Sequence, residues 1–233
     1  MIKAIINKLH SELPSTVKLV AVSKFHPCEA IEEAYKAGQR CFAESRPQEL
    51  LSKIKTLESR RSEMGDSQYM ADVQWHFIGH LQTNKLKMVL PYVSLVQSVD
   101  SVRLLDAIET WGDAHDKVIP VLLEPHVAAE ESKQGFAPEE ILQVVEAANE
   151  GRYPHVCFKG IMGMATFTDD ETVIHSDFAA LRSVFEAARE KLGVKSDDFN
   201  EFSIGMSDDY PIAIEHGSTI VRIGSMIFGE RIY

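Results

Sequence analysis

The segment Lys18-Leu-Val-Ala-Val-Ser-Lys24 joins a continuous apolar run to a lysine at its carboxyl end. Apolar residues occupy positions 19 to 22, and Pro27 ends the segment shortly after Lys24. A continuous apolar run bounded in this way is typical of a parallel strand that is buried on both faces. Because parallel strands carry their chemistry at their carboxyl ends, Lys24 is the first candidate for a functional side chain.

Lys24 would stand beside an apolar wall at that strand end. Removal from water disfavours a charged ammonium, so the wall is expected to lower the pKa of the lysine and to favour imine formation with a carbonyl compound. Its position alone also allows a solvated lysine at a strand end, because most lysines are exposed. The segment therefore predicts a buried strand and leaves two interpretations of Lys24 open.

Strands and helices alternate along the rest of the 233 residues. A helical pattern of apolar residues is clearest over residues 170–192, and Pro47 and Pro138 suit the first turns of two other helices. Residues 58–73 are polar and contain a glycine, so we expect a surface excursion there. After the first strand, seven more strands are expected at 41–43, 74–78, 93–96, 117–123, 156–162, 202–204 and 219–223.

Eight strands that alternate with helices predict an α/β protein with a single (β/α)8 TIM-type barrel. The length suits one domain over residues 1–233, and the amphipathic start of the chain predicts an extra N-terminal helix. A doubly wound open sheet shows the same alternation and is the main alternative.

Charge and composition exclude several classes of function. The formal net charge is -11, which argues against a broad surface for nucleic acid or an anionic membrane. No run approaches the roughly 20 apolar residues that span a bilayer, and the start of the chain lacks the pattern of a signal peptide. Cys28, Cys41 and Cys157 are too widely spaced for a disulfide framework or a zinc cluster, so a reducing cytoplasm is expected.

Two loops have the composition of a phosphate site. In a barrel, the loops after strands seven and eight are the usual place for a phosphate, and here they read Ser203-Ile-Gly-Met-Ser207 and Arg222-Ile-Gly224-Ser225. Small residues let the backbone approach an anion, the serines offer hydroxyls, and a helix is expected just after the first loop. Either loop alone could be a tight turn with a capping serine, but both would face Lys24.

Metal and nucleotide sites have little support. His76 and His80 are four residues apart, but Gly79 lies between them in a strand-to-loop segment, so helical metal-ligand geometry is not expected. The chain contains neither G-x-x-x-x-G-K-[ST] nor G-x-G-x-x-G, the glycine-rich motifs that bind the phosphates of nucleotides. Met162 and Met164 are expected to close the core at the end of a strand, and Lys133 to be a surface lysine.

Six segments together resemble the pyridoxal phosphate homeostasis protein family. They occur in the order of that family and span nearly the whole chain: Ala21-Val-Ser-Lys24, Trp75-His-Phe-Ile-Gly79, Leu81-Gln-Thr-Asn-Lys85, Glu131-Ser-Lys-Gln-Gly135, Gly205-Met-Ser-Asp-Asp209 and Val221-Arg-Ile-Gly-Ser225-Met-Ile-Phe-Gly229. The resemblance implies a fold like the N-terminal barrel of alanine racemase, with pyridoxal 5′-phosphate (PLP) as the cofactor.

The resemblance also implies roles for individual residues. Lys24 would hold PLP as an imine, and Arg222 would face the pyridine nitrogen. Ser207, Gly224 and Ser225 would bind the phosphate. Met206, which directly precedes Ser207, would also contact the cofactor. The chain reads Ala43-Glu-Ser-Arg46 where the family usually reads Gly-Glu-Asn-Tyr, so Ser45 stands in place of an asparagine near the cofactor. Gly79-His80-Leu81 likewise departs from the usual Gly-Pro-Leu.

By resemblance, the protein would hold PLP and deliver it, without being an enzyme and with no catalytic residues or metal. An arginine keeps the pyridine nitrogen unprotonated, so the ring is a poor electron sink. A single barrel would also lack the opposing tyrosine base that alanine racemase takes from a partner subunit. The expected state is a cytoplasmic monomer that contacts apo PLP enzymes only transiently. The alternatives are a PLP-dependent amino-acid racemase or related enzyme, with His80 or Lys133 as base, and a lysine-imine aldolase acting on a sugar phosphate.

Overall fold

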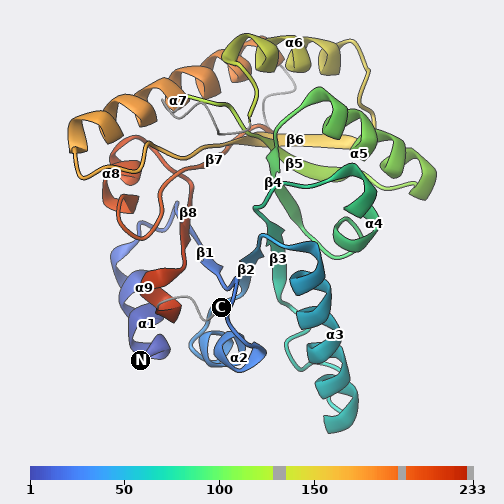
Figure 1. Ribbon diagram of the computed structural model, residues 1–233, viewed down its shortest axis with the longest axis vertical. Helices are drawn as coiled ribbons and strands as arrows, with labels where there is room; N and C mark the ends of the chain where they lie inside the picture. Colours follow the sequence, from blue (N-terminus) through green and yellow to red (C-terminus); the bar gives the residue numbers. More distant parts are fainter. Residues whose placement is uncertain (128–134, 194–197, 230–233) are drawn as a thin grey trace.

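A closed barrel of eight parallel strands forms the centre of the molecule (Figure 1). The computed structural model describes residues 1–127, 135–193 and 198–229. The strands pair in chain order from β1 to β8, and β8 pairs with β1 to close the ring. They are β1 (Lys18–Val22), β2 (Cys41–Glu44), β3 (Gln74–Phe77), β4 (Leu95–Val99), β5 (Ile119–Leu123), β6 (Val156–Met162), β7 (Glu201–Ser203) and β8 (Ile220–Ile223).

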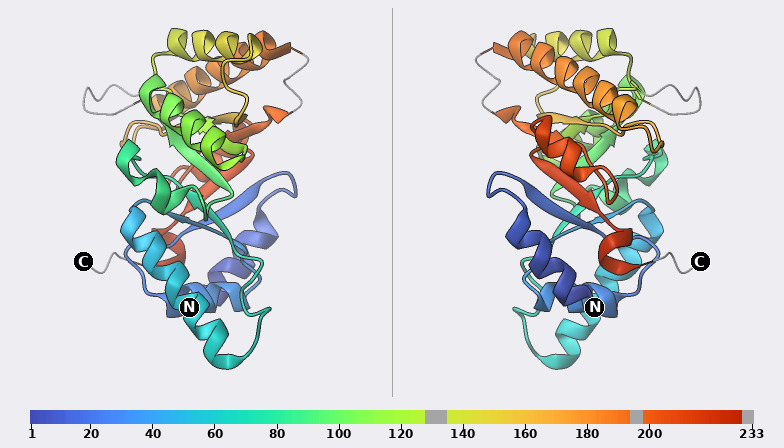
Figure 2. Two further views of the ribbon diagram at one scale, coloured as in Figure 1. Left: turned by 90° about the vertical axis from the view of Figure 1, so that its right-hand side faces the viewer. Right: turned by 90° about the vertical axis from the view of Figure 1, so that its left-hand side faces the viewer.

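Helices cover the outside of the barrel, as Figure 2 shows from two sides. The long helices α6 and α7 lie side by side over one part of the barrel, and the short α9 lies against α1. The helices are α1 (Ile2–Glu12), α2 (Cys28–Lys36), α3 (Pro47–Met64), the 3₁₀ turn η1 (Thr83–Lys85), α4 (Leu86–Val89), α5 (Val102–His115), α6 (Pro138–Asn149), α7 (Glu171–Leu192), α8 (Tyr210–Glu215) and α9 (Ser225–Phe228).

The closed ring confirms the (β/α)8 barrel and the extra N-terminal helix, and it rules out the open sheet. The register opposes Val20 of β1 to Arg222 of β8. Because both strands run the same way, Lys24 and the loop that follows Arg222 emerge at the same, carboxyl-terminal end of the barrel.

The barrel has two apolar layers. Alternate strand residues point outward to the helices and form the larger core, as Leu19 and Ala21 do in β1. The inward residues form a smaller cluster inside the ring, made of Val20, Val22, Cys41, Ala43, Leu95, Leu122, Met162 and Ile220. Polar residues complete the interior: His76, Gln97, Ser203 and Arg222 are all buried.

Several predicted boundaries differ from the structure by one or two residues, and two were wrong by more. α3 continues to Met64 through part of the predicted excursion and ends at Gly65, whose left-handed conformation caps the helix. Near this end, Arg60 pairs with Glu29 and Glu32 of α2. The fourth strand is Leu95–Val99 rather than 93–96, because Gln97 continues it with a polar side chain that is buried and hydrogen-bonded inside the barrel. A search for apolar runs cannot detect such a strand. Among the described residues, no helix has the length and apolar character needed to cross a membrane.

Candidate functional site

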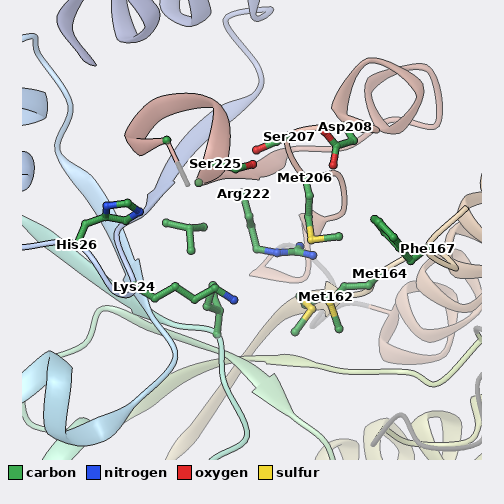
Figure 3. A pocket seen from close by; sticks show the side chains of 14 residues that line it. Lys24, His26, Met162, Met164, Phe167, Met206, Ser207, Asp208, Arg222 and Ser225 are labelled. Carbon is green, nitrogen blue, oxygen red and sulfur yellow. The ribbon is translucent and has the colours of Figure 1, made fainter. Parts of the chain in front are cut away.

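A cavity of about 650 Å³ opens at the carboxyl-terminal end of the barrel (Figure 3). Its wall combines one amine, two hydroxyls, a guanidinium, an imidazole and a carboxylate with a largely apolar side. The described residues that line it are Val22, Lys24, His26, Ile78, Met162, Met164, Phe167, Met206, Ser207, Asp208, Arg222, Gly224, Ser225 and Gly229.

Lys24 enters this cavity from the end of β1. Leu19 and Ala21 face the helices, and alternation therefore turns Ser23 outward and Lys24 inward. The lysine is half-buried, and its side chain extends across the cavity toward Arg222 in Figure 3. The structure thus places the sequence-predicted lysine in a pocket and not on the open surface.

The loops after β7 and β8 meet on one side of the cavity. The backbone N–H of Met226 donates to the Ser207 hydroxyl over 3.4 Å, and the N–H of Arg222 donates to the carbonyl of Gly205 over 2.9 Å. Gly205 has a φ of +95°, and a Cβ there would lie 2.6 Å from the Cβ of Ala213, so this turn requires glycine. Both predicted loops therefore face one space.

Arg222 is held inside the barrel by three hydrogen bonds. One terminal nitrogen donates to the Ser203 carbonyl at 2.7 Å and to its hydroxyl at 2.8 Å, and the other donates to the Gly163 carbonyl at 2.9 Å. The side chain is only 4% exposed. Burial lowers the pKa of Arg222 to about 10, so the guanidinium stays protonated near neutrality and can only donate.

A chain of hydrogen bonds continues from Arg222 across the barrel. The Ser203 hydroxyl donates to Gln97 Oε1 at 2.7 Å, and Gln97 Nε2 then donates to His76 Nδ1 at 2.7 Å. Because every member has a defined direction, His76 must carry its proton on Nε2. Burial lowers the pKa of His76 to about 3, so the ring is neutral and able to accept this bond.

Several lining residues carried no sequence signal. His26 is buried against the ring of Phe228, with 5.3 Å between ring centroids, and burial lowers its pKa. Its spacing of two from Lys24 is the one pattern that could have found it. Met162 lines the cavity and also belongs to the inner apolar cluster, as expected. Met164 was expected to close the core as well, but it is half-buried, lies outside both apolar clusters and only lines the cavity. Phe167 is 89% exposed at the rim.

Other candidates lie apart from the cavity lining. Ser45 is half-buried, and its contact with a ligand stays a prediction. His80 is exposed and its Nδ1 lies 2.7 Å from an Asp100 oxygen, while His76 is bonded inside the barrel, so the two histidines are not paired as ligands. Lys133 lies outside the described residues. Within the described ranges, no group of three His, Cys, Asp or Glu residues could hold a metal ion.

The chemistry of the lining favours a small anionic carbonyl compound. An amine can form an imine with an aldehyde, and two loops with small residues and hydroxyls can accommodate an anion. The apolar side formed by Ile78 and the methionines suits a flat organic ring.

Comparisons of the sequence with known proteins agree on one group. The family profile described as "Alanine racemase, N-terminal domain" matches residues 1–232. A pyridoxal phosphate homeostasis protein of Haemophilus influenzae is 36% identical over 94% of this chain and 87% of its own length. A human protein of the same name is 40% identical over 93% of this chain and 77% of its own length.

Solved structures give the same result. PipY of Synechococcus elongatus PCC7942, in the structure with PLP bound, has a TM-score of 0.83 at 29% identity and covers 98% of this chain and 100% of its own. An alanine racemase of Clostridium difficile 630 has a TM-score of 0.72 at 15% identity, over 98% of this chain and 55% of its own, and this likeness concerns the fold alone.

Proposed function

The chain belongs to the pyridoxal phosphate homeostasis protein family, and on this basis we propose that it binds PLP in the cavity and helps to keep the cellular PLP level in balance. The observation that carries the proposal is that Lys24 and the two serine loops line one cavity. Each of these three elements comes from a different part of the chain, and closure of the barrel brings them together.

The lining residues fit the parts of PLP one by one. Lys24 would hold the aldehyde carbon as an imine, and Ser207, Gly224 and Ser225 would receive the phosphate, with Met206 beside them. A Cβ on Gly224 would lie 3.1 Å from the Val22 carbonyl oxygen, so glycine lets the loop after β8 pass close to the end of β1. Ser45 would contact the cofactor from outside this lining.

We also propose that the protein carries PLP without amino-acid turnover typical of enzymes. PLP would supply an electron sink for carbanions, and this sink is stronger when the ring nitrogen is protonated. Arg222 would face that nitrogen, and its hydrogen bonds to Ser203 and Gly163 fix its orientation. A guanidinium can donate a hydrogen bond to the nitrogen but does not transfer its proton. The nitrogen would therefore stay unprotonated.

The residues that line the cavity also argue against efficient racemisation. A two-base racemase needs proton donors on both faces of the bound substrate, and a tyrosine fills one of these roles in alanine racemase. In alanine racemase that tyrosine comes from a partner subunit, and the described residues that line the cavity of this chain supply no tyrosine themselves. Of the two other candidate bases, His80 is exposed and paired with Asp100, and Lys133 lies outside the described residues.

Transfer of the cofactor tests the carrier role. The loaded protein should restore the activity of an apo PLP enzyme while its own imine absorbance fades, and Lys24→Ala should not restore it. A protein that stays colourless with added PLP would overturn the proposal and favour a lysine-imine aldolase.

A screen of L- and D-amino acids tests the absence of enzymatic turnover. Racemisation, transamination and decarboxylation should all stay far below the median enzyme rate of about 10 per second. Lys24-dependent turnover at such rates would establish a PLP enzyme instead.

Three further expectations belong to this proposal. Residues 1–233 would act as a single PLP-binding domain, in line with the closed barrel and with a family profile that spans residues 1–232. The protein would work as a cytoplasmic monomer, where Cys28, Cys41 and Cys157 remain thiols. Its contacts with apo PLP enzymes would be transient.

A further inference from the structure

A buried cluster of charges lies directly behind Lys24, between the barrel and α3. Lys53 of α3 is 6% exposed, and its ammonium donates to Glu44 Oε1 and Glu49 Oε1 at 2.7 Å each and to the Ser23 carbonyl at 2.8 Å. An ammonium has three protons, and all of them are used here. We call Lys53, Glu44 and Glu49 the α3 cluster.

Stability alone is a weak reason for a protein to keep the α3 cluster. Removing charges from water is costly, and apolar residues of the same size are often as stable as a buried ion pair. Glu44 is fully buried, its Oε2 has no hydrogen-bond partner among the described residues, and burial raises its pKa to about 7. A cluster that leaves a buried oxygen unsatisfied calls for a reason beyond packing.

Its contacts converge on the two residues that flank Lys24. The Ser23 hydroxyl donates a hydrogen bond to Glu44 at 2.6 Å, and the Ser23 carbonyl accepts one from the Lys53 ammonium. Phe25 donates its backbone N–H to Glu49 Oε1 at 2.6 Å. The α3 cluster therefore holds the backbone immediately before and immediately after Lys24.

The backbone it holds is in an unfavourable conformation. Phe25 has a φ of +69°, in the left-handed region that residues other than glycine rarely adopt. Such a conformation persists only when surrounding contacts impose it. The bond from Phe25 to Glu49 is one such contact, and Glu49 is in turn fixed by Lys53.

We propose that Lys53 is a positioning residue for Lys24: through Glu44 and Glu49 it holds the strained turn that directs the Lys24 amine into the cavity. The inference rests on the proposed binding of PLP at Lys24. Lys53 itself lies on the outer side of the strands and is not among the residues that line the cavity. It acts on the imine lysine only through the backbone of residues 23 to 25.

The first test compares apo-protein variants as they capture PLP. Lys53→Met should slow growth of the imine absorbance on the order of tenfold, since small misplacements of a reacting group cost up to about 100-fold. Lys55→Met is the matched control, because Lys55 is an exposed lysine of the same helix, and it should leave the rate unchanged. Equal rates for wild type and Lys53→Met would overturn the inference.

Two substitutions of Glu49 keep the test decisive if Lys53→Met fails to fold. Glu49→Gln retains an oxygen that can accept from Phe25 and Lys53, so it should keep a rate close to that of the wild type. Glu49→Ala removes the acceptor and should slow capture on the order of tenfold. Identical rates for the two variants would contradict the positioning role.

Hydrogen exchange of the apo-protein gives a readout that needs no cofactor. The Phe25 amide should be protected in the wild type and in Lys55→Met, and should exchange faster in Lys53→Met and Glu49→Ala. If the wild type forms no imine on Lys24, the proposed function fails while this arm still tests the turn. An unprotected Phe25 amide in the wild type would overturn the positioning role of Lys53 and leave the proposed function untouched.

Discussion

The guanidinium of Arg222 donates to both the carbonyl and the hydroxyl of Ser203, at 2.7 and 2.8 Å. Ser203 thereby sits in the middle of a chain whose far end is His76. The four side chains in this series of hydrogen bonds are all buried: Arg222, Ser203, Gln97 and His76. Each hydrogen bond fixes the direction of the next. The cavity-facing arginine is thus oriented by residues that do not line the cavity.

Ser203→Ala should destabilise the protein by about 1–3 kcal/mol, because it leaves the Gln97 oxygen without a donor and takes one acceptor from Arg222. Urea unfolding measures the change. Ser183→Ala is the control, since Ser183 is an exposed serine of α7 whose hydroxyl donates to the Ala179 carbonyl of the same helix, and it should change stability little. Equal effects of the two substitutions would contradict the buried chain.

His76 should remain neutral down to about pH 3, because burial disfavours its charged form. In the unfolded chain an ordinary histidine binds its proton near pH 6.5. Between these values the unfolded state binds more protons, so the stability that His76 contributes is present above pH 6.5 and is lost as the pH falls toward 3.

NMR titration of the histidine rings checks this directly. His155 serves as the internal reference, because its hydrogen bond to Glu109 raises its pKa above the ordinary value. The His76 resonances should stay constant over the range in which His155 titrates. Titration of His76 near pH 6 in the folded protein would show that it is not enclosed in the barrel.

Lys24→Ala should abolish the imine absorbance and the adduct reduced by borohydride, while circular dichroism shows an unchanged fold. The expected reason is that no other amine in the described part of the cavity wall can replace it. Lys85→Ala is the control, since Lys85 lies in η1 outside the lining, and it should keep the adduct. Mass spectrometry that found the adduct mainly on Lys85 or Lys133 would move the site.

Ser207→Ala and Ser225→Ala should each weaken PLP retention by about 0.5–1.5 kcal/mol for one neutral hydrogen bond, and by more where the phosphate charge strengthens it. Ser207→Ala should have an additional effect on the loops, because its hydroxyl also accepts from Met226. Titration with pyridoxal, which lacks the phosphate, should show far weaker binding. Equal affinity for the two compounds would remove these loops as the anion site.

The order of strands and helices, the place of Lys24 and the two serine loops could all be predicted from the sequence. Each depends on local patterns: a continuous apolar run for β1, helical spacing for α7, and small residues after β7 and β8. Local patterns suffice there because burial of a strand or helix face is encoded in neighbouring residues.

Only the tertiary structure could reveal the partners of these residues. Gln97 looks like the polar end of a strand until the closed barrel places it between His76 and Ser203. Lys53 looks like an ordinary helical lysine until α3 packs on the barrel and buries it behind Ser23. Both residues are polar, and a polar residue becomes part of a core only when distant segments supply its hydrogen bonds, which no local pattern encodes.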